Sequence, residues 1–439
     1  MQKTFQIFMR NSKPRVLVLS SVSPTIGPAI IGEQIYEALK QKGLEVDFMT
    51  KYPEPDHPEY LWVVKENYER NLFARIKRRL MWLLVGGLPK ENGHYFFYTY
   101  ESCPPVPSHM VLKAIKKQYD LVYIVFWQGL LSFETVECIY DKLHCQIQIA
   151  GVDYSQMSGG CHFTGDCQRY KLGCGMCPAF HSNRKNDFTA WNVRYRKRVY
   201  DKVKPIVGGN NYMYQFYKES FLLKDARVEI GSSPIIDTDF FRPLDKSKLR
   251  KKYGIQETRR IVFFGCQKLD DERKGMSYLL EALSYLNQMM GKESESVLVI
   301  TAGNNYSEIK IRIPFESRGF GYVSMKELSE LYSIATCFVC PSINDAGPMM
   351  VNQSLCCGTP VVGFDMGAVG QVVKNQGSGI CVPLKDSRAL AEGILRVLRM
   401  NKDDYKKMSI RAREIALDTS SYEVQADSIL SIYKKYLNS

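Results

Sequence analysis

Short aliphatic runs alternate with amphipathic stretches in two successive series along this chain of 439 residues. A passage rich in Ser, Pro and Asp separates the two series. Such alternation is typical of buried parallel strands that are joined by crossover helices. A chain of this length is also too long for one ordinary hydrophobic core. The sequence therefore predicts an α/β protein built from two doubly wound, Rossmann-like domains.

The first series predicts an N-terminal domain over 1–232. Arg15–Ser20 and Leu44–Met49 read as buried strands, and Ile31–Lys42 between them has helical periodicity, which completes one βαβ unit. A turn containing Pro and Gly follows the first strand. Further strands are predicted at 121–126, 146–150 and 205–207. The helix at 420–439 is expected to pack back onto this domain.

The second series predicts a C-terminal domain over 233–419, after a linker at Val228–Pro243. Ligands of such domains bind at the carboxyl ends of parallel strands, so the expected site lies in a cleft between two facing domains. A single large doubly wound domain is the alternative, which the linker disfavours. The predicted elements are strands at 261–264, 297–301, 337–340 and 360–362, and helices at 276–290, 325–335 and 348–357.

Charge limits the class of partner. The formal net charge is +13, which favours acidic partners such as phosphates, anionic lipid or nucleic acid. No nucleic-acid-binding motif is present, so phosphates and a membrane surface are the expected partners. No apolar run is long enough to span a membrane, and residues 1–14 lack the apolar core of a signal peptide. These features predict a cytoplasmic protein.

Two segments of the second series predict an anion site. Lys274 follows the first strand of that series, and Pro341–Pro360 begins at the end of a strand and opens a helix. A lysine beside a helix N-terminus can neutralise the charge that grows on a departing diphosphate. Asp345 stands near the start of this helix, so a simple capping role for Asp345 is the alternative.

The same segments resemble the retaining glycosyltransferases of family 4, which have the GT-B fold. The matching segments are FFGCQKLDDERKGMSYLLEAL, GYVSMKELSELYSIA and PSINDAGPMMVNQSLCCGTPVV, over about 260–378. The resemblance implies that Lys274 binds the donor pyrophosphate. It also places Asp345 and Gln353 at two positions, usually glutamate, that contact the donor sugar and the ribose. No catalytic metal is implied.

We take Lys274 and Asp345 as catalytic candidates. Arg273 is a candidate for the arginine that often accompanies the lysine. The full set of expected donor-binding residues is Gly27, Arg273, Lys274, Gly275, Asp345, Gly347, Pro348, Met349 and Gln353.

The N-terminal half is similar to a subgroup of the same family that builds bacterial surface polysaccharides of the colanic acid, capsule and O-antigen type. That subgroup has a His-Asp pair where this chain has Val152 and Asp153, so the aspartate matches and the histidine does not. Asp153 is a third catalytic candidate, on the acceptor side. The resemblance implies a UDP- or GDP-hexose donor and a lipid-diphosphate-linked glycan acceptor.

A cysteine-rich insertion is predicted at 159–178. Its spacing is C-x5-C-x6-C-x2-C, formed by Cys161, Cys167, Cys174 and Cys177. Four thiolates at this spacing in a reducing compartment favour a structural zinc ion. His162 could replace one ligand. An iron–sulfur cluster needs the same thiolates, and two disulfides or free thiols are further alternatives.

Arg70–Gly87 mixes Arg and Lys with large apolar residues. The segment is too charged to span a membrane but suited to lie in an anionic membrane interface. An ordinary helix packed on the N-terminal core is the alternative. Peripheral binding at the inner face of the plasma membrane is the resulting expectation.

The sequence thus predicts a retaining hexosyltransferase. A catalytically degenerate protein that binds a nucleotide sugar is the first alternative, because Val152 and Gln353 depart from the family pattern. A sugar-nucleotide epimerase on the same fold is less favoured, because the second series contains no histidine to act on the sugar ring.

Overall fold

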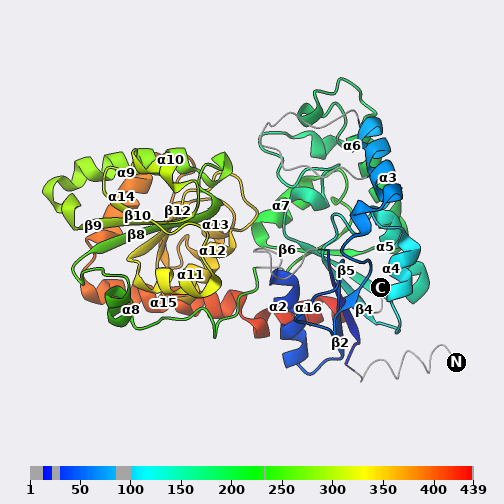
Figure 1. Cartoon of the computed structure of the whole chain (residues 1–439), viewed down its shortest axis with the longest axis horizontal. Helices are drawn as coiled ribbons and strands as arrows, with labels where there is room; N and C mark the ends of the chain where they lie inside the picture. Colours follow the sequence, from blue (N-terminus) through cyan, green and yellow to red (C-terminus); the bar gives the residue numbers. More distant parts are fainter. Residues whose placement is uncertain (1–12, 22–29, 86–99, 232–233, 438–439) are drawn as a thin grey trace. The chain divides into compact units, whose positions relative to one another are not determined.

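The computed structural model describes residues 13–21, 30–85, 100–231 and 234–437 (Figure 1). The chain divides into two compact units. Residues Met1–Ser232 and Gln425–Ser439 form one, which we call the N-terminal unit. Residues Ser233–Val424 form the other, the C-terminal unit.

The N-terminal unit is built on a parallel sheet of seven strands in the order β3-β2-β1-β4-β5-β6-β7. The order reverses between β1 and β4, as it does in Rossmann folds. In β1 all five residues are buried, which is expected of a central strand covered on both faces. The strands are β1 (Val16–Ser20), β2 (Val46–Thr50), β3 (Leu61–Trp62), β4 (Leu121–Phe126), β5 (Gln146–Gly151), β6 (Ile206–Gly209) and β7 (Arg227–Ile230).

Helices follow most of these strands. Helices α4, α5 and α6 pack in series, and α2 packs on β1 and β2. The helices are α2 (Ile30–Gln41), α3 (Leu72–Val85), α4 (Ser108–Ala114), α5 (Phe133–Leu143), α6 (Phe188–Val203) and α7 (Asn211–Glu219). Short 3-10 turns are η2 (Tyr68–Arg70), η3 (Tyr154–Gln156), η4 (Arg169–Leu172) and η5 (Pro178–Phe180).

The last helix, α16 (Tyr422–Lys435), completes the N-terminal unit. The side-chain amide of Gln146 donates to the carbonyl of Tyr433 at 3.1 Å, and Ser428 Oγ donates to the carbonyl of Gly231 at 3.0 Å. These bonds join α16 to the sheet through β5 and the end of β7.

The C-terminal unit has a six-stranded parallel sheet in the order β10-β9-β8-β11-β12-β13, with the reversal between β8 and β11. Two buried apolar clusters lie on its two faces. One includes residues of α9 and α14, and the other includes residues of α11, α12 and α15; Figure 1 shows these helices beside the sheet of this unit.

The strands of this unit are β8 (Arg260–Lys268), β9 (Val297–Asn304), β10 (Glu316–Gly319), β11 (Cys337–Cys340), β12 (Val361–Phe364) and β13 (Gly379–Val382). Its helices are α8 (Lys246–Lys252), α9 (Met276–Met290), α10 (Tyr306–Lys310), α11 (Met325–Ile334), α12 (Met349–Cys356), α13 (Ala368–Val372), α14 (Ser387–Leu398) and α15 (Lys402–Ser420), with the 3-10 turns η6 (Glu272–Lys274) and η7 (Gly291–Ser296).

The predicted fold class, α/β with two Rossmann-like doubly wound domains, is confirmed. The predicted strand at 337–340 and helix at 276–290 have the observed bounds. The predicted linker was partly wrong, because its first residues form the edge strand β7. Ile236 and Phe241, also within it, are fully buried in the C-terminal unit. Several apolar side chains of this passage are buried, so the segments that carry them belong to the two units and do not form an exposed linker.

Among the described residues, no helix is both long enough and apolar enough to cross a membrane.

Candidate functional site

Lys274 and Asp345 meet at the point in the C-terminal unit where the strand order reverses. Lys274 follows β8, Asp345 follows β11, and these two strands are neighbours in the sheet. The Lys274 ammonium donates a hydrogen bond to Asp345 Oδ2. In doubly wound sheets this position, at the carboxyl ends of the strands, is where ligands bind. Both sequence-predicted residues therefore lie together at the expected edge.

Backbone contacts hold the two loops together. The carbonyl of Arg273 accepts a hydrogen bond from the Ile343 amide at 2.8 Å. Gly275 has φ of 71°, and a Cβ there would lie 1.8 Å from the Pro341 carbonyl oxygen. Only glycine allows the loop after β8 to approach the loop after β11 so closely. Gly275 therefore serves to bring Lys274 to Asp345.

The Asp345 carboxylate keeps the Lys274 side chain protonated. Burial tends to lower the pKa of Lys274, but the Asp345 carboxylate more than offsets burial, and the net pKa lies above its usual value. Lys274 is therefore cationic at neutral pH. Asp345 Oδ1 also accepts from the Gly347 amide at 3.0 Å, which orients the carboxylate.

Asp345 does not cap the helix that follows. Helix α12 begins at Met349, and Pro348 occupies its N-cap position. The side chain of Asp345 instead binds within the loop, at Gly347 and Lys274. The sequence alternative of a purely capping aspartate is therefore wrong.

Other expected donor-binding residues have different surroundings. Gln353 is almost fully buried on α12, and its Oε1 accepts from the Tyr332 hydroxyl at 3.2 Å. Because a carbonyl oxygen has two lone pairs, Gln353 can still accept one further hydrogen bond. The guanidinium of Arg273 forms an ion pair with Asp271 at 2.6 Å. Gly27 lies outside the described residues.

In the N-terminal unit, Asp153 follows β5 and pairs with a histidine. Asp153 Oδ2 lies 2.6 Å from His162 Nδ1, and its Oδ1 accepts from the Ser155 amide at 2.7 Å. The Tyr217 hydroxyl donates to the Asp153 backbone carbonyl at 2.8 Å. A His-Asp pair is thus present, with its histidine nine positions after the aspartate rather than beside it.

Sequence reasoning missed His162 as the partner of Asp153. The pairing depends on how the loop after β5 folds back, because the Tyr154 amide donates to the His162 carbonyl at 3.1 Å. The only indication in the sequence was that a histidine lies a few residues after an aspartate at the end of a strand. This closeness does not by itself predict that the two side chains touch.

A buried arginine holds this loop. Arg196 on α6 is fully buried and pairs with Glu101, its Nε lying 2.7 Å from Glu101 Oε1. Its Nη1 donates to the carbonyls of Ser155 and Ser158 at 2.5 and 2.6 Å. Arg196 therefore fixes the backbone that carries Asp153 through both charge and hydrogen bonds.

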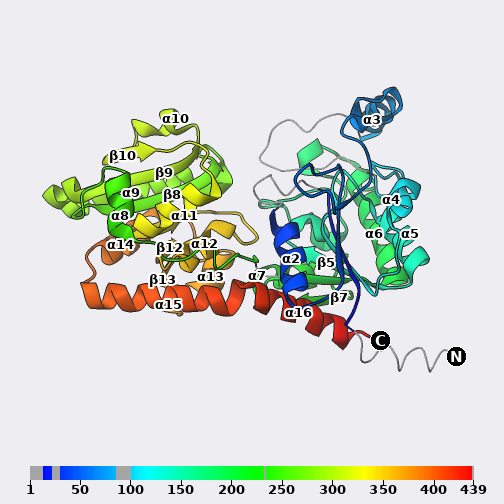
Figure 2. The same cartoon turned by 60° about the horizontal axis from the view of Figure 1, so that its bottom comes forward.

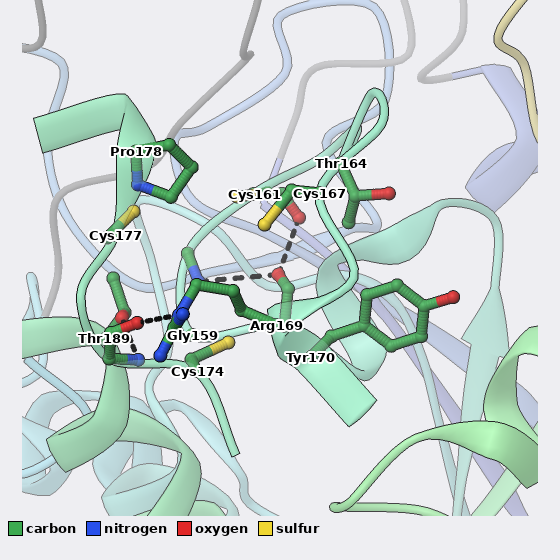
Figure 3. Close-up of a pocket in the computed structure, with 13 residues that line it drawn as sticks. Gly159, Cys161, Thr164, Cys167, Arg169, Tyr170, Cys174, Cys177, Pro178 and Thr189 are labelled. Atoms are coloured by element: carbon green, nitrogen blue, oxygen red, sulfur yellow. Dashed lines mark hydrogen bonds between the residues drawn. The ribbon is translucent and has the colours of Figure 1, made fainter. Parts of the chain in front are cut away.

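The four cysteines of the predicted insertion line one pocket with Gly159, Thr164 and Arg169, as Figure 3 shows. All four are free thiols. Among the described residues, no three His, Cys, Asp or Glu side chains are spaced so that they could hold a metal ion as they stand.

Helix α3 exposes a row of apolar side chains. Leu72, Ile76, Leu80 and Leu83 are exposed and share one helical face, and Leu83 is 78% exposed. Arg75 and Arg79 are also exposed on this helix. Figure 2 shows α3 projecting beyond the other helices of its unit. The face of α3 that carries these four residues is therefore not packed onto the N-terminal core.

Residues 245–415 match the family model described as "Glycosyl transferases group 1", which covers less than half of the chain. A phosphatidyl-myo-inositol mannosyltransferase of Mycobacterium leprae is 26% identical over 183 residues, 40% of this chain and 46% of that protein. The chain spans about half the length of the first curated relatives that it matches.

Solved structures match almost the whole chain. Sucrose-phosphate synthase from Thermosynechococcus elongatus has a TM-score of 0.65 at 15% identity, covering 96% of this chain and 99% of its own. HepE from Anabaena, in complex with UDP-glucose, has a TM-score of 0.59 at 12% identity, covering 96% and 100%. These likenesses confirm the GT-B fold class.

Proposed function

We propose that the chain is a retaining glycosyltransferase of family 4 that transfers a hexose from a UDP- or GDP-sugar to a lipid-diphosphate-linked glycan in surface polysaccharide synthesis. The observation that carries the proposal is the Lys274–Asp345 pair at the strand-order reversal of a glycosyl transferases group 1 domain. The similar HepE was solved with UDP-glucose, which supports a nucleotide-sugar donor.

In this mechanism Lys274 binds the donor diphosphate. The bond between the anomeric carbon and the phosphate oxygen breaks, and the negative charge that develops on the leaving group is stabilised by the ammonium. An acceptor hydroxyl forms the new glycosidic bond on the same face, and its proton passes to the departing diphosphate. Asp345, held by Gly347, orients the donor sugar.

Thermal stabilisation against UDP-, GDP-, dTDP- and CMP-sugars tests the donor, and mass detection of a glycosylated polyprenyl-diphosphate acceptor tests transfer. Stabilisation by one nucleotide class, together with product, is the expected result. A protein stabilised by none of these donors that forms no product would contradict the proposal.

The His162–Asp153 pair is proposed to contact the acceptor. Its histidine side chain is partly exposed whereas its aspartate is buried, so the ring can reach a ligand while the carboxylate orients it. We expect His162→Ala to lower kcat by about 10²-fold, because the acceptor hydroxyl is then no longer held in its reactive position. The measurement is steady-state transfer at saturating donor.

His109→Ala is the matched control, because His109 is an exposed histidine of the same unit on α4. It should leave kcat unchanged. Donor affinity should be the same in both variants, since neither residue is in the C-terminal unit. A His162→Ala enzyme with normal kcat would remove the pair from the reaction.

Helix α3 is proposed to bind the cytoplasmic surface of an anionic membrane, where the lipid-linked acceptor resides. Its exposed apolar row would enter the acyl boundary, while Arg75 and Arg79 would contact lipid phosphates. A helix of this charge and apolar exposure would otherwise present a costly face to water.

We expect the double substitution Leu80→Glu and Leu83→Glu to weaken binding to phosphatidylglycerol-containing vesicles by more than about tenfold, because two leucines that would enter the acyl boundary are replaced by carboxylates. Vesicle co-sedimentation measures it. Ile311→Glu is the control, since Ile311 is 92% exposed in the C-terminal unit. Equal binding by all three proteins would exclude α3 as the lipid contact.

A non-catalytic nucleotide-sugar-binding protein is the second candidate. It is favoured by Gln353, which replaces a carboxylate and whose acceptor oxygen already pairs with Tyr332. This candidate predicts donor-dependent thermal stabilisation without product formation at any acceptor concentration.

A further inference from the structure

The segment between β5 and α6 brings four cysteines from three turns to one pocket. Cys161 lies in the loop after η3, Cys167 precedes η4, and Cys174 and Cys177 lie between η4 and η5. Figure 3 shows these cysteines around one pocket. The cavity between them has a volume of about 20 Å³, which is room for a single small species.

The backbone around the CxxC pair is sharply bent. Gly173, Cys174, Gly175 and Met176 all have positive φ, at 90°, 60°, 81° and 47°. Cysteine and methionine rarely adopt this region, and each such residue costs folding energy. Gly175 is required, because a Cβ there would lie 2.1 Å from the Lys185 carbonyl oxygen. The chain therefore takes an unfavourable path whose result is that Cys174 and Cys177 share the pocket.

Backbone amides are directed at two of the sulfurs. Burial raises the pKa of both the Cys174 and Cys177 thiols, and backbone amides act in the opposite direction: that of Gly159 at Cys174, and those of Ala179 and Phe180 at Cys177. Amide contacts of this kind orient and stabilise metal-bound thiolates. None of the four cysteines forms a disulfide in the described part of the chain.

We propose that Cys161, Cys167, Cys174 and Cys177 together bind one zinc ion as four thiolates, with release of the thiol protons to solvent. The side chains are not at coordinating distances as they stand. Binding therefore requires the four sulfurs to move inward around the pocket that they already line. A site filled by four protein ligands is structural and takes no part in the transfer chemistry.

The ion would fix the position of His162. Cys161 is its direct neighbour in sequence, and His162 contacts Asp153 through Nδ1 and Tyr154 through its carbonyl. Anchoring Cys161 thus holds both contacts in place. The metal proposal itself stands apart from the proposed transferase activity, since it concerns only the cysteine-lined pocket.

The test is the metal content of the full-length protein, purified without added metal or chelator and measured by inductively coupled plasma mass spectrometry. We expect about one zinc per chain. Mercurial displacement in the presence of the dye 4-(2-pyridylazo)resorcinol should release the same amount. The double variant Cys174→Ser and Cys177→Ser should lose the zinc, whereas Cys103→Ser should keep it, because Cys103 does not line the pocket.

Alkylation of the unfolded protein without reductant gives a second readout that does not depend on the folding of any variant. All four cysteines should be alkylated once a chelator has removed the ion. Protein that contains no zinc but two disulfides or four unmetallated thiols would overturn the proposal. Iron and sulfide in place of zinc would overturn it as well, in favour of a cluster. None of these outcomes depends on whether sugar transfer is detected.

Discussion

Replacing Lys274 with alanine is expected to lower kcat for sugar transfer by about 10²- to 10³-fold, the loss usual for one charged donor at a developing anion. The ammonium lies at the carboxyl ends of β8 and β11 and remains cationic at neutral pH. Initial-rate assays over a range of donor concentrations measure the effect, and isothermal titration with the free nucleoside diphosphate separates binding from catalysis.

Lys252→Ala is the matched control. Lys252 also forms an ion pair with a carboxylate of the C-terminal unit, at 2.5 Å from Glu330, but it belongs to α8, before the first strand of the sheet. This variant should retain kcat. Lys274→Arg should recover part of the lost rate, because it restores the charge with a different shape. A Lys274→Ala protein with an unaltered kcat would refute the donor site.

Replacing Arg196 with methionine is expected to lower the free energy of unfolding of the N-terminal unit by about 3–5 kcal/mol. The substitution leaves Glu101, itself buried, without its cation and removes the donors to the Ser155 and Ser158 carbonyls. Urea denaturation followed by far-ultraviolet circular dichroism measures the change.

Arg198→Ala is the comparison on the same helix. Arg198 pairs with Glu137 at 2.6 Å, but its side chain is 59% exposed, so the expected loss is below about 1 kcal/mol. Adding Glu101→Gln to Arg196→Met should restore part of the stability, because the unpaired buried carboxylate is then gone. Equal losses for Arg196→Met and Arg198→Ala would show that burial of the first pair does not matter.

The alternation of strands and helices was readable because each strand needs a run of apolar residues and each helix a periodic stripe. That pattern also predicted the place of Lys274 and Asp345, since both follow strands of the second series. It did not reveal that β8 and β11 are adjacent, which comes from the strand order and makes the two residues partners.

Contacts between residues that are far apart in the chain could not be predicted from the sequence. Arg196 and Glu101 are separated by 95 positions, and nothing in either local pattern indicates that the charges are buried together. The exposure of α3 was equally undetermined, because an apolar stripe looks the same whether it faces a core or solvent. His162 contacts Asp153 because of the path of the loop between them. That path is set by irregular turns, which leave no periodic pattern in the sequence.

The N-terminal unit is discontinuous along the chain, because α16 joins it only after the whole C-terminal unit has been passed. During synthesis, Ser233–Val424 therefore leaves the ribosome before the residues of α16 that complete the N-terminal unit. Until then β5 lacks the bond from Gln146 to Tyr433. The unit that begins first in the sequence is thus the second to have all of its residues synthesised.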